Sequence, residues 1–546
     1  MRRSSMILMA LAMTAGACGS VAEPPEQGNG GTGGTTSSSG GSHQGGAAGQ
    51  VDAGAPDAPD ATCESGGALS APLMTDATAV FITSDTLAPA FEPYAHLHTL
   101  LGIPSSVVTT DQICAGQCDD ADPRADTAAH IKQWIMSQPA LRYVILAGDI
   151  EHVPARQVHD RYQNPILIGY SFEDDFQTDY YYADFSNWDG NGDGIYAEDG
   201  IDQPDYRPEI AVSRISSSTP EEAELYLGKV LRYLTDYEPA HAAKTLLLSN
   251  VATQFAGVDI DGAWYFEAEG KTLSLLPPGS EVRRLYATAM AGAEQNSVAA
   301  QIAAIEEGQN LVVHSGHGGV KYLTDNLSTG GSMTGEMAYE LTNSTYPIFL
   351  SSACEAGTFA ADDSAGEMLM NAPHGGAIAY LGNSVTGLGL AGGMQIIDEL
   401  LRFVQANPYP MLGDALLYAH DNMPEHDVFR VPVGNFDVPV VDPASYEWTQ
   451  KSATMFGDIL IPVWTGPPGE KVSISANRQD TCEGAMIELT VSPAVEGMAR
   501  VHAGASYYEV SVAEGRATLH LDHQPDSIGV GMAPAGRLAT MTNIEF

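Results

Sequence analysis

The sequence is poor in basic residues. Only 24 of its 546 residues are Lys or Arg, against 69 Asp or Glu, and the formal net charge is −45. Every contact with a nucleic-acid phosphate or an anionic lipid headgroup needs a cation that this chain mostly lacks. Nucleic acids and anionic membrane surfaces are therefore excluded as partners, whereas metal ions and basic peptides are favoured.

The sequence also lacks a long apolar run beyond its first residues, so we expect no internal transmembrane helix. At the start, Arg2 and Arg3 precede an apolar run from Met6 to Ala15, which is typical of an export signal and too short to span a bilayer. The small residues before Cys18 resemble a bacterial lipoprotein cleavage box, although Ala15 stands where Leu is usual. We expect an exported outer-membrane or cell-surface lipoprotein that touches the membrane only through a lipid anchor at Cys18. Ordinary cleavage nearby, giving a secreted protein, is the alternative.

Cysteine is scarce, with six residues in the chain. In an exported protein such cysteines are expected to form disulfides. Cys114 and Cys118 lie four residues apart and are predicted to pair. Cys63 and Cys482 could close a long loop, but nothing in the sequence establishes that bond. The remaining two cysteines, Cys18 and Cys354, are predicted to be chemically active.

Composition divides the chain into five parts. Gly28 to Gly54 is rich in Gly, Ser and Thr and is expected to be a flexible tether. From about residue 75, short apolar runs alternate with helical patterns, which specifies a mainly parallel sheet covered by helices. After about Gly457, short alternating segments follow one another without helices, as in a small antiparallel sandwich. The predicted parts are an export signal (1–18), a tether (19–70), a first α/β subdomain (71–240), a catalytic α/β subdomain (241–457) and an all-β, immunoglobulin-like sandwich (458–546).

The predicted secondary structure follows from this alternation. Strands are expected at 79–83, 106–109, 143–147, 246–248, 282–286, 311–314, 348–351 and 377–380. Helices are expected near 89–101, 125–137, 262–275, 295–306, 364–371 and 393–404. The sandwich strands are expected at 472–476, 487–491, 507–512, 517–521 and 527–532.

Two segments combine an apolar strand with a reactive side chain. LVVHSGHGG (311–319) places His317 between glycines, and PIFLSSACEAGTF (347–359) runs directly into Cys354. Sites in open parallel sheets form at the carboxyl ends of the strands, where both residues are expected. A thiolate beside an imidazolium can transfer acyl groups, and backbone N–H groups, here those of Gly318 and Cys354, would bind the oxyanion. A buried core cysteine and a tight turn are the alternative reading.

These motifs resemble the paired catalytic motifs of the caspase–legumain–gingipain clan of cysteine peptidases, and the wider chain resembles the gingipain family. The likeness is carried by YVILAGDIEHVPAR (143–156), YRPEIAVSRISSSTPEEAE (206–224), LTNSTYPIFLSSAC (341–354) and GGAIAYLGNS (375–384). It implies two tandem caspase-like αβα units and a cysteine endopeptidase acting on proteins or peptides. It also implies that Cys354 is the nucleophile, that His317 is the catalytic histidine, and that Gly318 with Cys354 forms the oxyanion hole.

The chain departs from the family at the residue that supports the histidine. Gingipains that cut after Arg or Lys carry a carboxylate just beyond the strand matching 245–250, and no acid occurs here between Asn250 and Asp259. Either Asp259 or Asp261 takes a supporting or substrate-binding role, or a backbone carbonyl orients His317. In the clan the segment 382–393 forms a wall of the substrate groove, so Asn383 and Ser384 are further substrate-binding candidates. His314 is expected to be packed or hydrogen-bonded, because its spacing within a strand points it away from His317.

A second site is predicted in WDGNGDGIYAEDG (188–200). Its acidic and amide side chains alternate, and Gly194 allows a sharp turn, which suits calcium. The loop is not an EF-hand, because its twelfth position is Gly200. A structural Ca²⁺ is expected with no organic cofactor, and an Asp/Gly-rich turn in water is the alternative. The predicted ligands are Asp189, Asn191, Asp193, the Ile195 carbonyl and Asp199, with Glu198 nearby.

Three functions remain open. The first is a monomeric, exported cysteine endopeptidase. The second is a sorting transpeptidase of the same family, in which an amine rather than water resolves the acyl-enzyme. The third is a non-catalytic adhesin or binding protein that keeps the peptidase scaffold, which the missing supporting acid favours.

Overall fold

The structure is a computed structural model. It describes residues 68–73, 76–163, 171–255, 258–325, 331–359, 363–390, 392–423, 430–433, 436–439 and 443–546. The predicted export signal, the Cys18 anchor, the Gly-rich tether and Cys63 lie outside these residues. In the described part, no helix combines the length and the apolar character that crossing a bilayer requires.

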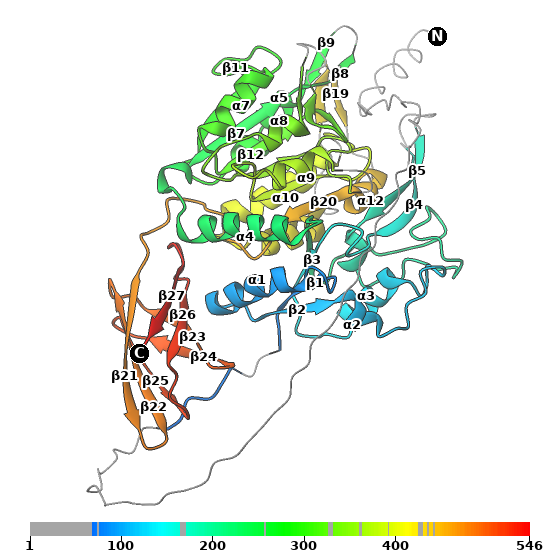
Figure 1. Cartoon of the computed structure of the whole chain (residues 1–546). Helices are drawn as coiled ribbons and strands as arrows, with labels where there is room; N and C mark the ends of the chain where they lie inside the picture. Colours follow the sequence, from blue (N-terminus) through cyan, green and yellow to red (C-terminus); the bar gives the residue numbers. More distant parts are fainter. Residues whose placement is uncertain are drawn as a thin grey trace, which may run out of the picture.

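One sheet of eleven strands runs through the α/β part of the chain (Figure 1). Both of its faces are buried, because alternate residues of a strand enter different apolar cores. Ala79 and Phe81 belong to one core, whereas Val80 and Ile82 belong to the other. In spatial order the strands are β11 (Glu294–Gln295), β10 (Glu281–Tyr286), β7 (Lys244–Ser249), β12 (Leu311–Ser315), β16 (Ile348–Ser351), β17 (Ala379–Asn383), β20 (Ala453–Gly457), β6 (Ala211–Ile215), β3 (Tyr143–Ala147), β1 (Ala79–Thr83) and β2 (Ser105–Thr109).

Strand β20 joins the two predicted α/β units into this single sheet. It pairs antiparallel with β17 on one side and meets β6 in parallel on the other, where Phe456 lies opposite Arg214. The α/β class expected from the sequence is therefore confirmed, and the two units share one continuous sheet.

Helices cover the sheet, and several begin at residues that cap their free N–H groups. Helix α4 starts after Thr219, whose hydroxyl accepts the N–H of Glu222 while the Glu222 carboxylate accepts the N–H of Thr219. Ser364 and Glu367 form the same reciprocal pair at the start of α9. The helices are α1 (Ala88–Leu101), α2 (Thr110–Cys114), α3 (Thr127–Met136), α4 (Pro220–Thr235), α5 (Gly262–Phe266), α6 (Thr272–Leu275), α7 (Val298–Glu306), α8 (Gly335–Tyr339), α9 (Ala365–Met370), α10 (Gly393–Ala406), α11 (Leu412–Asn422) and α12 (Pro443–Ser452), with short 3₁₀ turns at Tyr180–Tyr182 and Pro239–His241.

Small antiparallel hairpins project from the sheet connections. Their strands are β4 (Arg156–Gln163) with β5 (Ser171–Thr178), β8 (Val251–Phe255) with β9 (Val258–Asp261), β13 (His317–Gly319) with β14 (Tyr322–Asp325) and β15 (Ser332–Thr334), and β18 (Arg430–Val433) with β19 (Phe436–Pro439). The hairpin β13–β14–β15 carries one of the two predicted catalytic motifs.

The C-terminal residues form an all-β domain of two antiparallel sheets with a core of its own. The domain packs beside α1 (Figure 1), where Gly531 lies so close to Leu100 that a Cβ on the glycine would be 2.5 Å from the Leu100 carbonyl oxygen. His96 and Tyr507 share a hydrogen bond of 2.6 Å across this contact. The sheets are β21 (Ser473–Thr481), β22 (Gly484–Ser492) and β25 (Arg516–Leu521), and β24 (Ser506–Val512), β23 (Gly497–Ala503), β26 (Ser527–Met532) and β27 (Thr540–Glu545).

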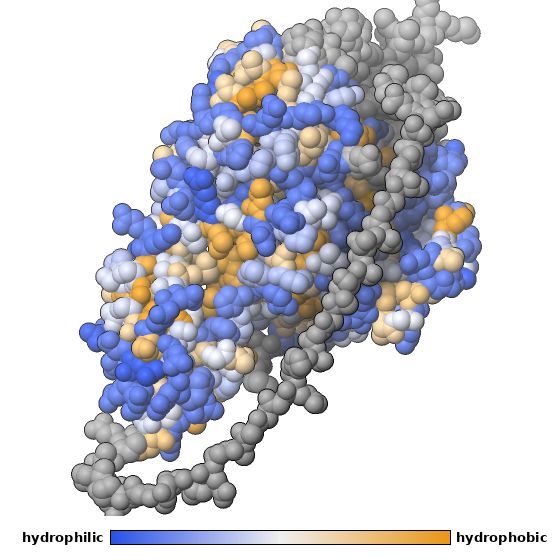
Figure 2. All heavy atoms as spheres, in the orientation of Figure 1, coloured by the Kyte–Doolittle hydropathy of each residue, from blue (hydrophilic) through white to orange (hydrophobic). Residues whose placement is uncertain are grey.

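The surface agrees with the acidic composition. Figure 2 shows hydrophilic residues over most of the visible face, with apolar residues gathered in a few areas. A cavity of ≈ 360 Å³ lies at the junction of the α/β part and the C-terminal domain, lined by Leu101, Trp464 and Pro534 among others. None of the residues that line this cavity belongs to either predicted catalytic motif.

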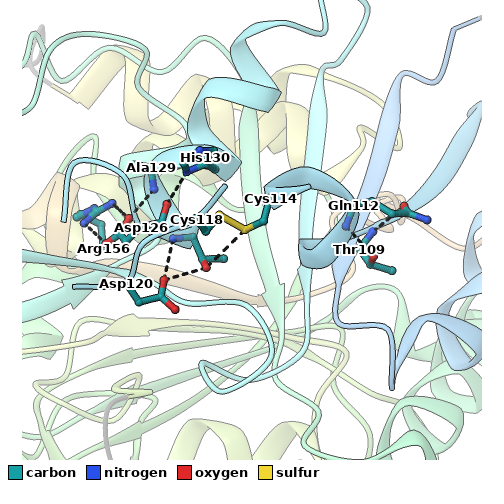
Figure 3. The surroundings of a disulfide bond; sticks show 10 residues. Thr109, Gln112, Cys114, Cys118, Asp120, Asp126, Ala129, His130 and Arg156 are labelled. Carbon is teal, nitrogen blue, oxygen red and sulfur yellow. Dashed lines mark hydrogen bonds and ion pairs between the residues drawn. A yellow bond between two sulfur atoms is a disulfide. The ribbon is translucent and has the colours of Figure 1, made fainter. Parts of the chain in front are cut away.

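The predicted Cys114–Cys118 disulfide is confirmed (Figure 3). It closes the turn after α2, whose last residue is Cys114. Asp126 then begins α3 by accepting the N–H of Ala129, and the same carboxylate binds the Arg156 guanidinium at 2.7 and 2.9 Å. The disulfide and this ion pair together fix the connection between α2 and α3.

Candidate active site

The two predicted catalytic motifs lie at one edge of the sheet because their strands are neighbours. Strands β12 and β16 pair in parallel with a register that runs from Leu311 opposite Ile348 to His314 opposite Ser351. His317 and Cys354 each follow the last of these pairs by three residues. The carboxyl ends of parallel strands share an edge, so the imidazole and the sulfur belong to adjacent loops.

Those two loops are in direct contact. A Cβ added to Gly318 would lie 2.7 Å from the Cβ of Ala353 and 3.2 Å from the carbonyl oxygen of Cys354. A real Cβ does not approach another carbon this closely, so the sequence needs glycine here. The absence of a side chain at Gly318 therefore lets the histidine loop rest on the cysteine loop.

The histidine stands on a small hairpin. His317 is half-buried, and it begins β13 opposite Asp325 of β14. Residues directly opposite in an antiparallel pair share one face of the hairpin, which places the Asp325 carboxylate on the face of His317. Ser332 donates a hydrogen bond of 2.8 Å to that carboxylate. Asp325 was not predicted to support His317, because the supporting acid was expected in the segment after the strand now identified as β7.

A buried polar network lies directly beneath the site. His314 is fully buried, as its predicted packed role requires, and its ring contacts the Ser351 hydroxyl at 2.9 Å through Nδ1 and the Asn250 amide oxygen at 3.0 Å through Nε2. Burial, with a smaller contribution from His317, lowers the pKa of His314 to about 3. His314 is therefore a neutral imidazole at physiological pH.

The loop after Cys354 is strained. Glu355 has a φ of 55°, in the left-handed region that non-glycine residues seldom occupy, and the N–H of Ala356 lies only 2.6 Å from the Cys354 carbonyl oxygen. Glu355 donates its N–H to Val385 of the neighbouring loop at 3.0 Å. Burial, and secondarily the charge of Asp174, raises the pKa of Glu355.

Asn383 and Ser384, predicted to bind substrate, are both buried and bonded within the protein. The Asn383 amide donates to the carbonyl of Ala353, the residue before Cys354, at 2.8 Å, and it accepts from the Ser452 hydroxyl at 3.1 Å. Ser384 donates to the Gln177 carbonyl at 2.9 Å. Asn383 thus supports the cysteine loop from behind.

Asp261 also has a structural position. Its side chain is fully buried, and its two oxygens accept the N–H groups of Ala263 at 2.9 Å and Thr288 at 2.6 Å. Through the first of these bonds Asp261 caps α5. This differs from the substrate-binding role predicted for it. Asp259 lies on β9, and its side chain is outside the described part of the structure.

The sulfur of Cys354 is oxidised in this structure. Cys354 and Cys482 are both disulfide-bonded, and no cysteine of the described residues is a free thiol. Cys354 is nearly buried, and its sulfur lies 3.7 Å from the Gly387 carbonyl oxygen. This differs from the reactive thiol predicted at Cys354, because a disulfide sulfur has to be reduced before it can attack as a thiolate.

The predicted calcium loop is held by its own hydrogen bonds. Asp189 accepts the N–H groups of Gly192, Asp193 and Gly194 at 2.7 to 3.0 Å, and Asn191 donates to the Asp193 carboxylate at 2.8 Å. Ile195 is exposed, and its N–H binds Asp193 at 2.9 Å. In the described residues, no three His, Cys, Asp or Glu side chains are grouped to hold a metal. The carboxylate and amide oxygens of this loop are ligands that suit Ca²⁺, and calcium binding by the loop stays a prediction.

Comparison with known proteins identifies the same fold. Residues 73–464 match Peptidase family C25. The crystal structure of the Arg-specific cysteine proteinase gingipain R superimposes with a TM-score of 0.60 at 16% identity, covering 87% of this chain and 99% of that one. The complex of pro- and mature domains of the same Porphyromonas gingivalis enzyme gives a TM-score of 0.59 at 15% identity, covering 86% of this chain and 99% of that one. At these identities the likeness shows the fold alone.

A curated relative is more similar in sequence but covers less of the chain. An uncharacterized protein of Archaeoglobus fulgidus is 25% identical over 304 residues, which are 51% of this chain and 66% of that protein. The match thus spans slightly less than two thirds of the relative's own length.

Proposed function

The chain belongs to peptidase family C25, and from this premise we propose that it is a cysteine endopeptidase that cleaves proteins or peptides through Cys354 and His317. The contact of Gly318 with the Ala353 Cβ and the Cys354 carbonyl carries the proposal. The parallel pairing of β12 and β16 brings the histidine and cysteine motifs onto one edge of one sheet, and this contact holds their two loops together.

In the proposed reaction, reduction of the disulfide first releases the Cys354 thiol, which passes its proton to the His317 imidazole. The thiolate attacks the peptide carbonyl, and the backbone N–H groups of Gly318 and Cys354 bind the resulting oxyanion. His317 gives a proton to the leaving amine as the C–N bond breaks, which leaves a thioester on Cys354. Water, deprotonated by His317, hydrolyses the thioester and restores the thiol. Asp325, which lies opposite His317 in the hairpin, is proposed to orient the imidazole.

The location and the metal belong to the same proposal. The basic and apolar start of the chain, the small residues before Cys18 and the Cys114–Cys118 disulfide support export to an oxidising compartment, with a lipid anchor or secretion as its outcome. The loop of Asp189 to Asp199 is proposed to hold a structural Ca²⁺. The catalytic unit is proposed to act as a monomer.

The decisive experiment compares reduced wild-type protein with Cys354→Ala and His317→Ala variants on casein and on a peptide library. Both variants are expected to lose hydrolysis. Ser352→Ala is the matched control, because Ser352 is buried beside Cys354 and its hydroxyl has no hydrogen-bond partner among the described residues. Full activity in the Cys354→Ala variant would contradict the proposal.

A non-catalytic binding protein is the second candidate, and the disulfide at Cys354 favours it, since an oxidised sulfur has no nucleophilic role. The two candidates differ in what reduction does. The peptidase gains thiol-dependent hydrolysis after mild reduction, whereas the binding protein gains none.

A further inference from the structure

We propose that His314, which takes no part in the proposed reaction, is a positioning residue that links the loop of Cys354 to the hairpin of His317. This inference rests on the proposed function. It starts from the two hydrogen bonds that His314 makes inside the sheet, one to Ser351 and one to Asn250.

The donors and acceptors of this network fix its direction. Asn250 donates through its amide nitrogen to the Asp325 carbonyl at 2.8 Å, so its amide oxygen faces His314 as an acceptor. His314 therefore carries its proton on Nε2. Its Nδ1 is then an acceptor and takes the hydroxyl proton of Ser351. One neutral tautomer satisfies every group.

Each end of the network reaches one catalytic loop. At one end, the Ser351 hydroxyl accepts the N–H of Ala353, the residue before Cys354, at 3.2 Å. At the other end, the Asp325 carbonyl that binds Asn250 belongs to the residue opposite His317 in the hairpin. The order Ala353, Ser351, His314, Asn250 and Asp325 thus joins the nucleophile loop to the histidine hairpin.

The loop of His317 also rests on the centre of this network. A Cβ added to Gly316 would lie 2.6 Å from Asn250 Cβ and 3.0 Å from both His314 Nε2 and Asn250 Oδ1. Gly316, the residue before His317, therefore lies against the hydrogen bond between His314 and Asn250. Gly318, on the other side of His317, rests on Ala353. The backbone on both sides of His317 therefore contacts residues of the hydrogen-bond network that His314 connects.

The consequence for catalysis is geometric. Fully buried polar groups that are all satisfied make a rigid unit, whereas a single missing partner leaves its neighbours unpaired. Removing the imidazole nitrogens releases Ser351 and Asn250 together and lets the two loops shift relative to each other. A displacement of about 1 Å between reacting groups can lower the rate about 100-fold.

The test uses the full-length reduced protein with His314→Phe, which keeps an aromatic ring without its hydrogen bonds, and His314→Gln, which offers one acceptor and one donor. For His314→Phe we expect kcat to fall about 10- to 100-fold with KM nearly unchanged. We expect His314→Gln to recover most of that loss. Ser351→Ala, which opens the network from its other end, is expected to resemble His314→Phe, whereas Ser352→Ala stays like the wild type.

A second readout separates this inference from the proposed function. The rate at which iodoacetamide alkylates reduced Cys354 near pH 6 depends on the imidazole beside the thiolate and needs no peptide substrate. A wild-type protein that is alkylated rapidly but cleaves no peptide would refute the peptidase, and the alkylation rates of the variants would still test His314. If His314→Phe does not fold, the kcat and the alkylation rate of Ser351→Ala test the inference in its place. Wild-type kcat and alkylation rates in folded Ser351→Ala or His314→Phe overturn the inference.

Discussion

His317 and Cys354 occupy equivalent positions on two neighbouring parallel strands, each three residues beyond the pair formed by His314 and Ser351. The separation of His317 and Cys354, the proposed catalytic pair, is therefore set by the register of β12 and β16 and by the packing of Gly318 on Ala353. Changes to either feature should alter catalysis without touching the substrate.

Reduction is expected to activate the protein. Because Cys354 is disulfide-bonded in the structure, oxidised protein should hydrolyse little peptide, and tris(2-carboxyethyl)phosphine should restore activity in step with the appearance of one alkylatable thiol at Cys354. The measurement is the rate of peptide hydrolysis against reductant concentration, with mass-spectrometric mapping of the alkylated cysteine. A double Cys114→Ala/Cys118→Ala variant should keep the same dependence, and equal activity of fully oxidised protein would contradict the expectation.

Substitution of Gly318 by Ala should reduce kcat/KM about 100-fold, because the new methyl group forces the loops of His317 and Cys354 apart. Gly228 provides the control, since it lies within α4 and a Cβ there has no heavy atom within 4 Å. Gly228→Ala should keep full activity and gain roughly 0.5–1 kcal/mol of unfolding free energy through helix propensity. Steady-state kinetics measures the change in kcat/KM, and urea unfolding measures the change in the free energy of unfolding. A Gly318→Ala enzyme with wild-type kcat/KM would show that the contact between the two loops is dispensable.

Asp325→Asn should lower kcat by about 100-fold, because the carboxylate proposed to orient His317 is lost while the backbone carbonyl that binds Asn250 remains. Ser332→Ala removes only the hydroxyl that binds the carboxylate and should have a much smaller effect. Kinetics on one peptide substrate compare the two variants. Similar kcat values for Asp325→Asn and the wild type would assign the orientation of His317 to another group.

Lys229 gives a stability prediction that depends on pH. Its side chain is nearly fully buried against the Met370 carbonyl at 2.7 Å, and burial lowers its pKa from 10.5 to about 7. Between these values the unfolded chain binds the proton and the folded chain does not, so this residue makes the protein more stable as pH rises from 7 to 10.5. Below pH 7 the buried charge is a constant penalty.

Below about pH 7, the free energy of unfolding of Lys229→Met should therefore be roughly 1–4 kcal/mol higher than that of the wild type. The difference should shrink as pH approaches 10.5. Urea titrations of both proteins across this range supply the comparison. A difference that is independent of pH would mean that Lys229 keeps an ordinary pKa in the folded protein.

Calcium should stabilise the first α/β half if the loop of Asp189 and Asp193 binds it. A free Ca²⁺ concentration 100-fold above the dissociation constant adds about 2.7 kcal/mol to the unfolding free energy, so the melting temperature should rise with Ca²⁺ and fall with a chelator. Asp189→Ala and Asp193→Ala should abolish the response, whereas Mg²⁺ should reproduce little of it. Identical melting curves with Ca²⁺ and with chelator would leave the loop as a hydrogen-bonded turn.

The sequence predicts the strands that are apolar on both faces. The residues expected for β1, β3 and β16 are those observed, since continuous apolar runs leave no doubt about burial. Strand β6 was missed because it carries Arg214, and this fully buried guanidinium is satisfied by Asp179 at 2.7 and 2.8 Å and by two backbone carbonyls. Such a long-range ion pair is invisible in a local pattern.

The same limit applies to the site. The motifs around His317 and Cys354 were legible because each combines an apolar strand with a reactive residue and glycine. Asp325, Ser351 and Asn250 were not assigned, because their positions follow from pairing between strands that lie far apart in the sequence.

The predicted helix at 262–275 is two short helices, α5 and α6, since the chain turns between Phe266 and Thr272.

Strand β20 has a consequence for the order in which the protein is made. Residues 453–457 lie between β17 and β6, at the centre of the eleven-stranded sheet, yet the ribosome synthesises them after every other strand of that sheet. A nascent chain that already contains both predicted catalytic motifs still lacks the strand that joins β17 to β6. The eleven-stranded sheet is thus closed only after residue 457 has been synthesised, so under the proposed function a nascent chain that stops before β20 should be inactive.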